Sequence, residues 1–188
     1  SLIVGGSYPK ARMRINEFAK LMRSTLYNAR KPFITLQEEA DTLYRYLEIE
    51  QFCQAQPFTF EIVLPEGIDS DEVSLPPMLL QPFVENAVLH GISHLDYAGH
   101  ITIEFTLEEE LLHVCIKDNG VGRKKAAQLQ EERKPGHQSV ALKVTKERLE
   151  AMRGHDPYES LKITDIMDTK GNIKGTKVEV VLPIEHAY

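Results

Sequence analysis

The spacing of apolar residues predicts two helices in the first part of the chain. Apolar side chains recur every three or four residues before residue 30, so they form one stripe of a helix from about Ser7 to Ala29. The residues of this stripe are Ile15, Phe18, Ala19, Met22 and Leu26. The segment Thr35-Leu36-Gln37-Glu38 is typical of a capping box and predicts a second helix that runs to about Gln54. Its apolar face holds Leu36, Ala40, Leu43 and Leu47.

From Pro57 onward, strand patterns alternate with helical ones. The segment 58–64 is strand-like, and apolar residues alternate with polar ones over 101–107 and 112–116. A final hairpin is expected, with strands near 161–166 and 178–182. Helices are expected at 76–91 and at about 139–152, and the polar stretch 120–138 is expected to be a flexible loop. This order predicts an α+β fold, a two-layer α/β sandwich in which helices cover one face of a sheet.

The two patterns divide the chain into a helical hairpin, residues 1–56, and a sandwich, residues 57–188. A length of 188 residues suits one domain with such an appendage. An isolated pair of helices has too little core to be stable alone. The hairpin is therefore either an ordinary appendage or half of a dimeric helical bundle.

Composition and charge narrow the possible functions. The chain has 22 Lys+Arg and 28 Asp+Glu, a formal charge of −6, and no long basic run, which disfavours nucleic-acid binding through phosphates. An apolar content of 42% excludes disorder of the whole chain, and no apolar stretch approaches the ~18 residues of a membrane span. Two distant cysteines, Cys53 and Cys115, suit a reducing, cytoplasmic setting.

The segment 82–91 holds the first candidate for chemistry. Asn86 and His90 are four residues apart and share a helix face, and Glu85 lies about a quarter turn away. Polar residues beside a buried stripe can simply face solvent. In a cleft, Asn86 would instead offer an oxygen to Mg²⁺, and Glu85 would handle a proton or orient a nucleophile.

Two further segments are candidates for binding a nucleotide. Asp118-Asn119-Gly120-Val121-Gly122 follows a strand, where a carboxylate could accept a hydrogen bond from an exocyclic amine and glycines could let the backbone approach a ring. Asp, Asn and Gly are also common in ordinary turns, so this segment could be only a turn. A polar stretch that ends at Gly136-His137-Gln138-Ser139 could serve as a phosphate site and lid, or as a plain surface loop.

Together with Gly175-Thr176, these segments resemble, in order, the four nucleotide-binding boxes of the GHKL ATPases, which share the Bergerat fold. The resemblance is closest to the LytS-like sensor histidine kinases, whose N box is matched nearly residue for residue from Leu75 to Gly91. Upstream, the segments 21–27, 36–39 and 46–50 resemble the part that follows the phosphoacceptor box in that branch. The resemblance covers about residues 10–183.

The resemblance implies ATP and Mg²⁺ as ligands and assigns roles on the phosphate side. Asn86 would ligate the Mg²⁺ that bridges the phosphates, Glu85 would polarise the attacking group, and His90 would lie near the phosphates. Gly136 would belong to the lid that covers them. These roles concern positioning and charge neutralisation, which dominate phosphoryl transfer.

On the adenine side, the resemblance implies that Asp118 accepts a hydrogen bond from the adenine amine. Gly120 and Gly122 would shape the pocket, and Thr176 would close its far side. The lid departs from the family pattern. Ser139, Ala141 and Val144 stand where the family has two glycines and an asparagine, and Leu89 stands where related sequences often have Lys. The lost glycines oppose a tight backbone wrap around the triphosphate, and the missing Lys predicts either weaker ATP affinity or reliance on the lid lysines and Mg²⁺.

The function implied is the ATP-binding catalytic domain of a sensor histidine kinase in a two-component system. It would transfer the γ-phosphate of ATP to a His, and the phosphoryl group would pass to an Asp of a response regulator. None of the seven histidines, 90, 94, 100, 113, 137, 155 and 186, lies in the N-terminal helices. We therefore expect the acceptor His upstream, so that these residues alone would not autophosphorylate in cis.

The expected partners are a response regulator and a second copy bound through the N-terminal helices. The parent is expected to be a membrane-anchored sensor with this part on the cytoplasmic side. One alternative is a non-catalytic interaction module that keeps the fold but has impaired ATP use, which the changed lid favours. Another is a GHKL enzyme of a different kind, such as a Ser kinase or an ATPase switch, which the helical segment before Pro57 disfavours.

Overall fold

A mixed five-stranded sheet forms one layer of the protein. The computed structural model describes residues 8–133, 140–153 and 160–186. The strands lie in the order β2-β4-β5-β7-β6, and every neighbouring pair is antiparallel except β2 and β4, which are parallel. Their bounds are β2 Phe58–Val63, β4 Gly99–Glu108, β5 Leu111–Asp118, β6 Leu161–Met167 and β7 Ile173–Pro183. The strands predicted from the sequence are therefore confirmed.

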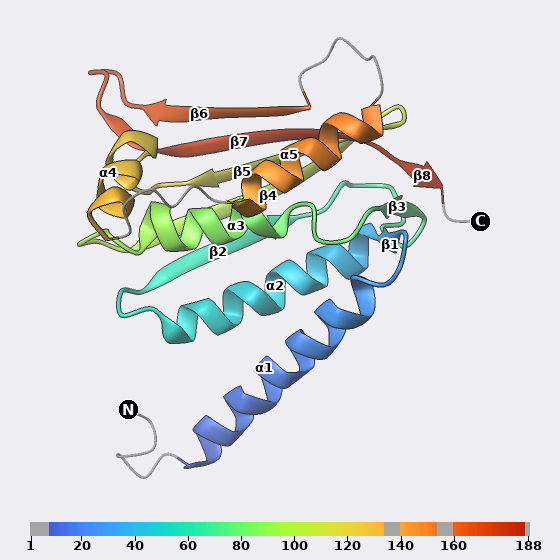
Figure 1. Cartoon of the computed structure of the whole chain (residues 1–188), viewed down its shortest axis with the longest axis horizontal. Coiled ribbons are helices and arrows are strands. Elements are labelled where there is room, and N and C mark those ends of the chain that lie inside the picture. The colour runs from blue at the N-terminus through green and yellow to red at the C-terminus, as the bar shows by residue number, and fades with distance from the viewer. Residues whose placement is uncertain (1–7, 134–139, 154–159, 187–188) are drawn as a thin grey trace.

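Helices cover one face of this sheet (Figure 1). They are α2 Leu36–Cys53, α3 Gln81–Asn86, η1 Ala87–Ile92 and α5 Val140–Arg153. Along β4, Ile101, Ile103 and Phe105 are buried beneath these helices, whereas Thr102 and Glu104 are only half-buried. Such alternation is expected of a sheet with one covered face. The predicted two-layer α+β sandwich is confirmed.

The parallel pairing of β2 and β4 places α3 and η1 over the sheet. Parallel neighbours need a crossover connection, whereas antiparallel neighbours can be joined by a tight turn. The crossover here runs through β3 Val73–Leu75, α3 and η1. β3 also forms a small second sheet with β1 Ile34–Thr35 and β8 Glu185–His186. This second sheet was not predicted, because strands of two or three residues carry no readable alternation.

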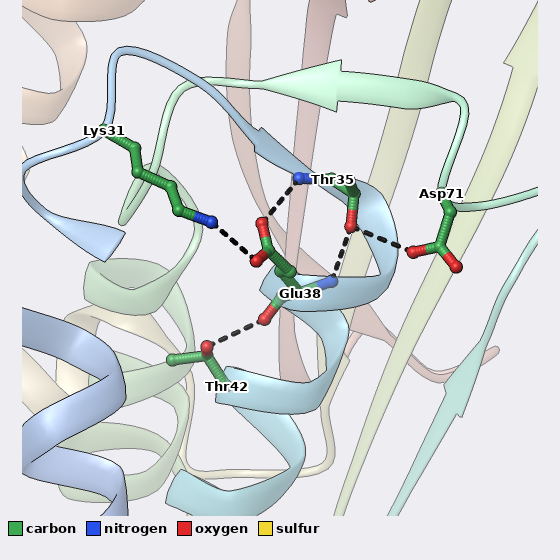
Figure 2. Close-up of polar contacts among 5 residues, drawn as sticks. All are labelled: Lys31, Thr35, Glu38, Thr42 and Asp71. Carbon is green, nitrogen blue, oxygen red and sulfur yellow. Dashed lines mark hydrogen bonds and ion pairs between the residues drawn. The ribbon is translucent and has the colours of Figure 1, made fainter. Parts of the chain in front are cut away.

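The capping box at the start of α2 is confirmed (Figure 2). The Thr35 hydroxyl accepts a hydrogen bond from the Glu38 N–H at 3.1 Å, and the Glu38 carboxylate accepts one from the Thr35 N–H at 3.1 Å. Lys31 contacts the same carboxylate at 2.8 Å, and Thr35 also donates to Asp71 at 3.2 Å. Thr42 bonds the Glu38 carbonyl one turn later, at 2.8 Å. The cap thus ties α2 to the segments on either side of it.

The two N-terminal helices have different environments. In α2, Leu36, Leu43 and Leu47 are fully buried in the same apolar cluster as the sheet and α3. By contrast α1, Tyr8–Asn28, projects away from the sheet (Figure 1). The apolar stripe predicted for α1 faces solvent along most of its length, because Ile15, Phe18, Met22 and Leu26 are 43–64% exposed. None of the helices within the described ranges is long and apolar enough to cross a membrane. The domain boundary at residues 56 and 57 remains a prediction.

Three sequence-based predictions about helices were wrong. The helix expected at 76–91 begins only at Gln81, because residues 76–80 form a turn in which Met78 adopts a φ of 60°. Gly91 does not end it, since the chain continues as the π-helix η1 to Ile92. The stretch expected to be a flexible loop contains a helix, α4 Arg123–Arg133. Its residues are mostly good helix formers, which intrinsic propensity favours even without an apolar stripe.

We predict that Leu43→Ala lowers the free energy of unfolding by about 2–5 kcal/mol, because it leaves a cavity in the shared core. The matched change Leu26→Ala, at a position 60% exposed, is expected to change it by about 0.5 kcal/mol or less. Urea unfolding of both variants measures the difference. Equal losses would show that α2 is not part of the folded core.

Candidate functional site

A cavity of about 280 Å³ lies between the helical layer and the sheet. Its helical wall comes from α3 and η1, its floor from β5, β6 and β7, and a third side from α4. The lining residues are Phe83, Asn86, Ala87, His90, Gly91, Ile116, Asp118, Arg123, Ala126, Ala127, Ile163, Thr176 and Val178. Most of this wall is apolar, with a few polar groups that would orient a ligand, which is the usual character of a small-molecule site.

Asp118 is the buried carboxylate of this cavity. It ends β5, is 6% exposed, and lies opposite Thr176 in the register of β5 and β7. Its Oδ1 accepts hydrogen bonds from the backbone N–H of Gly120 at 2.8 Å and of Thr176 at 3.2 Å. The Thr176 side chain adds a third hydrogen bond to the carboxylate.

Burial raises the pKa of Asp118 to about 6. The hydrogen bonds from Gly120 and Thr176 act against this shift, and the nearby charge of Asp165 adds to it. Removing a carboxylate from water disfavours its charged form, and the backbone donors compensate only in part. A donor from a ligand would stabilise the charged form further.

Three glycines allow the backbone to crowd around Asp118. A Cβ on Gly120 would lie 2.4 Å from the Gly91 carbonyl, and one on Gly175 would lie 1.8 Å from the Asp118 carbonyl oxygen. A Cβ on Gly91 would meet the Asp118 carboxylate at 3.0 Å. The Val121 N–H donates to the Gly91 carbonyl at 3.1 Å and holds η1 against the chain that follows β5. The predicted pocket residue Gly122 does not line the cavity; it has a φ of +77°, and a Cβ there would lie 2.2 Å from Ile173.

On the helical side, Asn86 and His90 both line the cavity, as their spacing predicted. The Asn86 amide nitrogen donates to the Pro82 carbonyl at 2.6 Å. Its oxygen is therefore the atom that could ligate a cation. The chain between the two residues enters the π-helix η1, and short π segments inside α-helices are frequent at functional sites. The structure thus places this segment in a cleft rather than on an open surface.

Glu85 is not among the residues that line the cavity. Its carboxylate accepts a hydrogen bond from the Gln81 side chain at 2.9 Å. The pKa of Tyr46 on α2 is raised, first by burial and then by the charges of Glu50 and Glu85. Glu85 therefore lies toward α2, outside the cavity wall. Its catalytic role remains a prediction.

Sequence reasoning missed the contribution of α4 and β6. Arg123, the first residue of α4, donates its backbone N–H to Asp165 at 2.9 Å and its guanidinium to the Ile163 carbonyl at 2.9 Å. These bonds fix the start of α4 against β6. The small side chains of Ala126 and Ala127 then face the cavity. A pair of alanines after the glycines was the available signal for a helix that packs closely over a ligand.

The predicted lid lies mostly beyond what the structure describes. Gly136 and Ser139 fall outside the described residues, and the side chain of Ala141 is not described. Val144 lies on α5 and is 47% exposed. The expectation of weaker ATP binding through this segment therefore remains a prediction.

Comparison with known sequences gives two family matches. Residues 76–186 match the family described as histidine kinase-, DNA gyrase B- and HSP90-like ATPase, and residues 1–57 match the histidine kinase family. The sensor protein LytS of Oceanobacillus iheyensis is 29% identical over 180 residues, which are 93% of this chain and 29% of that protein. The sensor histidine kinase BtsS of Escherichia coli is 34% identical over 94 residues, 49% of this chain and 16% of that protein. The chain thus spans less than a third of these relatives.

Solved structures support the fold. The histidine kinase domain of the blue-light activated kinase from Erythrobacter litoralis EL346 gives a TM-score of 0.53 at 15% identity, covering 90% of this chain and 72% of that one. The mycobacterial sensor histidine kinase MprB also gives 0.53 at 15% identity, covering 82% of this chain and 98% of that one. Likeness at such low identity concerns the fold alone.

We predict that Asp118 makes stability fall as pH rises. Because its pKa is about 6 in the folded protein and 3.8 ordinarily, the folded state holds the proton more tightly than the unfolded state. The contribution of Asp118 to the free energy of unfolding is fully present below about pH 4 and is lost by about pH 6. The loss amounts to about 3 kcal/mol. Urea unfolding at several pH values should show this decline.

The control for this prediction compares two variants. Buried Glu39 on α2, whose pKa is raised from 4.5 to about 7, contributes a decline that overlaps this range in both variants. In Asp118→Asn the decline between pH 4 and 6 should therefore become smaller by the share of Asp118, whereas Asp96→Asn, at an exposed position, should keep it in full. Identical profiles for the two variants would contradict the assignment of the pH dependence to Asp118.

Proposed function

Because the chain belongs to the family of histidine kinase-, DNA gyrase B- and HSP90-like ATPases, we propose that its cavity binds ATP with Mg²⁺ for phosphoryl transfer to a His. The observation that carries the proposal is the meeting of Asp118 with Asn86 and His90 at one cavity, from two separate parts of the sequence. The chain would be the catalytic part of a two-component sensor histidine kinase. The relatives named above support this, although the chain spans only part of their length.

The adenine ring fits the sheet side of the cavity. Asp118 offers a carboxylate oxygen to an exocyclic amine, and Ile116, Ile163 and Val178 supply an apolar surface beside it. Guanine has a carbonyl oxygen where adenine has its amine, so it would bring an acceptor against a carboxylate. A buried polar group left facing the wrong partner costs considerable binding energy. The cavity should therefore select adenine.

The phosphates and Mg²⁺ fit the helical side. Asn86 would bind the cation through its amide oxygen, and His90 would lie beside the phosphates. When bound, Mg²⁺ would neutralise charge that develops on the transferred phosphoryl group. Arg123 lines the cavity, and Lys124 and Lys125 follow it in α4, so the start of this helix carries positive charge. Phosphoryl transfer needs little covalent participation by the protein. The side chains position the reactants and neutralise the charge on the phosphates.

The phosphoacceptor and the later steps belong to the whole protein. We propose that the acceptor His lies upstream, and that the phosphoryl group passes from it to an Asp of a response regulator. Glu85 would polarise the attacking imidazole, which would approach from outside the cavity, where Glu85 lies. The parent would be a membrane-anchored sensor with this part on the cytoplasmic side.

The exposed stripe of α1 supports dimerisation through the N-terminal helices. Ile15, Phe18, Met22 and Leu26 form an apolar surface along a helix that touches the sheet layer little (Figure 1). Exposed stripes of this kind usually mark an interaction surface. A second copy, or the helix that carries the acceptor His, would cover it.

The departures at the lid favour a second function, a non-catalytic interaction module with impaired ATP use. Ser139, Ala141 and Val144 restrict the backbone where the family has glycines and an asparagine. Such a module would keep the fold and the surfaces of the kinase. It would bind ATP weakly or not at all.

Calorimetric titration of ATP distinguishes these two functions. The unmutated chain is expected to give saturable heat with ATP and Mg²⁺ and a clear preference over GTP. Asp118→Asn should weaken ATP binding by about tenfold or more and reduce the preference, since it places an amide donor near the adenine amine. Asn86→Ala should weaken binding only when Mg²⁺ is present.

Asp96→Asn serves as the matched control for this titration and should bind like the unmutated chain. The absence of saturable heat for the unmutated chain would favour the interaction module. Equal affinity for ATP and GTP would contradict the role proposed for Asp118.

Dimerisation is tested by Phe18→Glu. A charge in the centre of the α1 stripe should oppose association, because burying it without a partner is costly. Sedimentation of the unmutated chain at increasing concentration should show a growing dimer fraction, and the variant should stay monomeric with its ATP affinity unchanged. The same concentration dependence for both proteins would rule out this surface.

A further inference from the structure

A glutamate lies buried in the core at the junction of three elements. Glu39 shares the inner face of α2 with Leu36 and Leu43, where an apolar residue would be ordinary, and is 2% exposed. Charged side chains are almost never fully buried unless other groups compensate them. Its presence on this face therefore calls for specific partners.

The partners of Glu39 are backbone groups of the turn that leads into α3. One carboxylate oxygen accepts from the Met78 N–H and the other from the Leu80 N–H, each at 3.4 Å. Arg148 of α5 donates to the Pro77 carbonyl of the same turn at 3.1 Å. α2 and α5 thus both hold this turn.

This turn needs outside support. Its two prolines, Pro76 and Pro77, have no N–H to donate, and Met78 has a φ of 60°, a conformation that non-glycine residues rarely adopt. Leu80, the N-cap of α3, makes no side-chain cap of its own. Strained backbone persists only where its surroundings hold it. The Glu39 carboxylate supplies the acceptors that the turn itself lacks.

We call the two bonds from Met78 and Leu80 to Glu39 the clamp. The electrostatic environment of Glu39 agrees with these bonds. Burial raises the pKa of Glu39 to about 7, while the N–H groups of Leu80 and Met78 and the charge of Arg148 pull it down. These are the groups that stabilise its charged form. Loss of the clamp would leave a buried carboxylate without compensation.

We propose that Glu39 is a positioning residue for the nucleotide site: it fixes the start of α3 against α2 and thereby sets the place of Asn86 on the Mg²⁺ side of the cavity. This inference rests on the proposed ATP-binding function. α3 runs directly from the clamped turn to Asn86 and continues into η1, which carries His90. Asp118 belongs to β5, whose place is set by its pairing with β4 and β7. A displacement of the turn would therefore shift Asn86 more than Asp118.

The test compares Glu39→Gln with Glu48→Gln, a change of the same charge on the same helix away from the clamp. Gln has one acceptor oxygen, so its amide nitrogen would face one of the two N–H groups. For Glu39→Gln we expect the Kd of ATP with Mg²⁺ to rise by about tenfold. The Kd of adenosine without Mg²⁺ should stay unchanged. Amide hydrogen exchange at Met78 and Leu80 in the nucleotide-free protein should become faster.

A second substitution separates positioning from a general loss of stability. Met78→Gly makes the φ of 60° easy to adopt, so the turn should depend less on Glu39. In that background the effect of Glu39→Gln on Mg²⁺-ATP binding should shrink. If Glu39→Gln yields no folded protein, Glu39→Asp, which is one methylene shorter, is measured in the same way.

Three outcomes would overturn the inference. One is equal binding and exchange for the Glu39 and Glu48 variants. A second is an equal loss of affinity for adenosine and for ATP with Mg²⁺, which would show a merely structural role. The third is the absence of any rescue by Met78→Gly. An unmutated chain that binds no ATP would instead overturn the proposed function itself, and the positioning role with it.

Discussion

The burial of one carboxylate constrains the architecture of the site. Asp118 lies in an apolar cavity where hydration is lost, and two backbone N–H groups from Gly120 and Thr176 replace only part of it. Those donors come from chain segments that must approach within hydrogen-bond distance. Glycines at positions 91 and 175 allow this approach, since a Cβ at either would collide with Asp118. β7 and η1 thus both pack closely against the end of β5, while the bonds of Arg123 fix the start of α4 against β6.

The sequence was informative wherever a local pattern determined the structure. Alternation located the long strands, and the capping box located α2 to within a residue. Helical spacing placed Asn86 and His90 on one face, and the resemblance of the four segments to known boxes predicted a shared site; Asn86, Asp118 and Thr176 do line one cavity. These features depend on residues close in sequence, or on a resemblance that spans most of the chain.

The features that were missed depend on distant residues. The start of α3 is set by Glu39, about forty positions upstream, which no local rule detects. The direction of Glu85 depends on α2 packing beside α3. α4 has no apolar stripe, so its pattern resembled that of a loop, although it forms one side of the cavity. The strands of the small sheet are too short to show any period.

The packing of α2 bears on how a signal could reach the site. Leu43 and Leu47 are fully buried in one core with Phe83 of α3, and interiors of this kind are close-packed. Moving α2 away from the sheet would open cavities at a cost of several kcal/mol, so α2 and the sheet respond as one body. α1 buries far less of its described surface, and its junction with α2 is held by the ion pair of Lys31 with Glu38 and by the cap (Figure 2). A displacement of α1 would therefore act at that junction, and the packing of α2 in the shared core would carry it to α3.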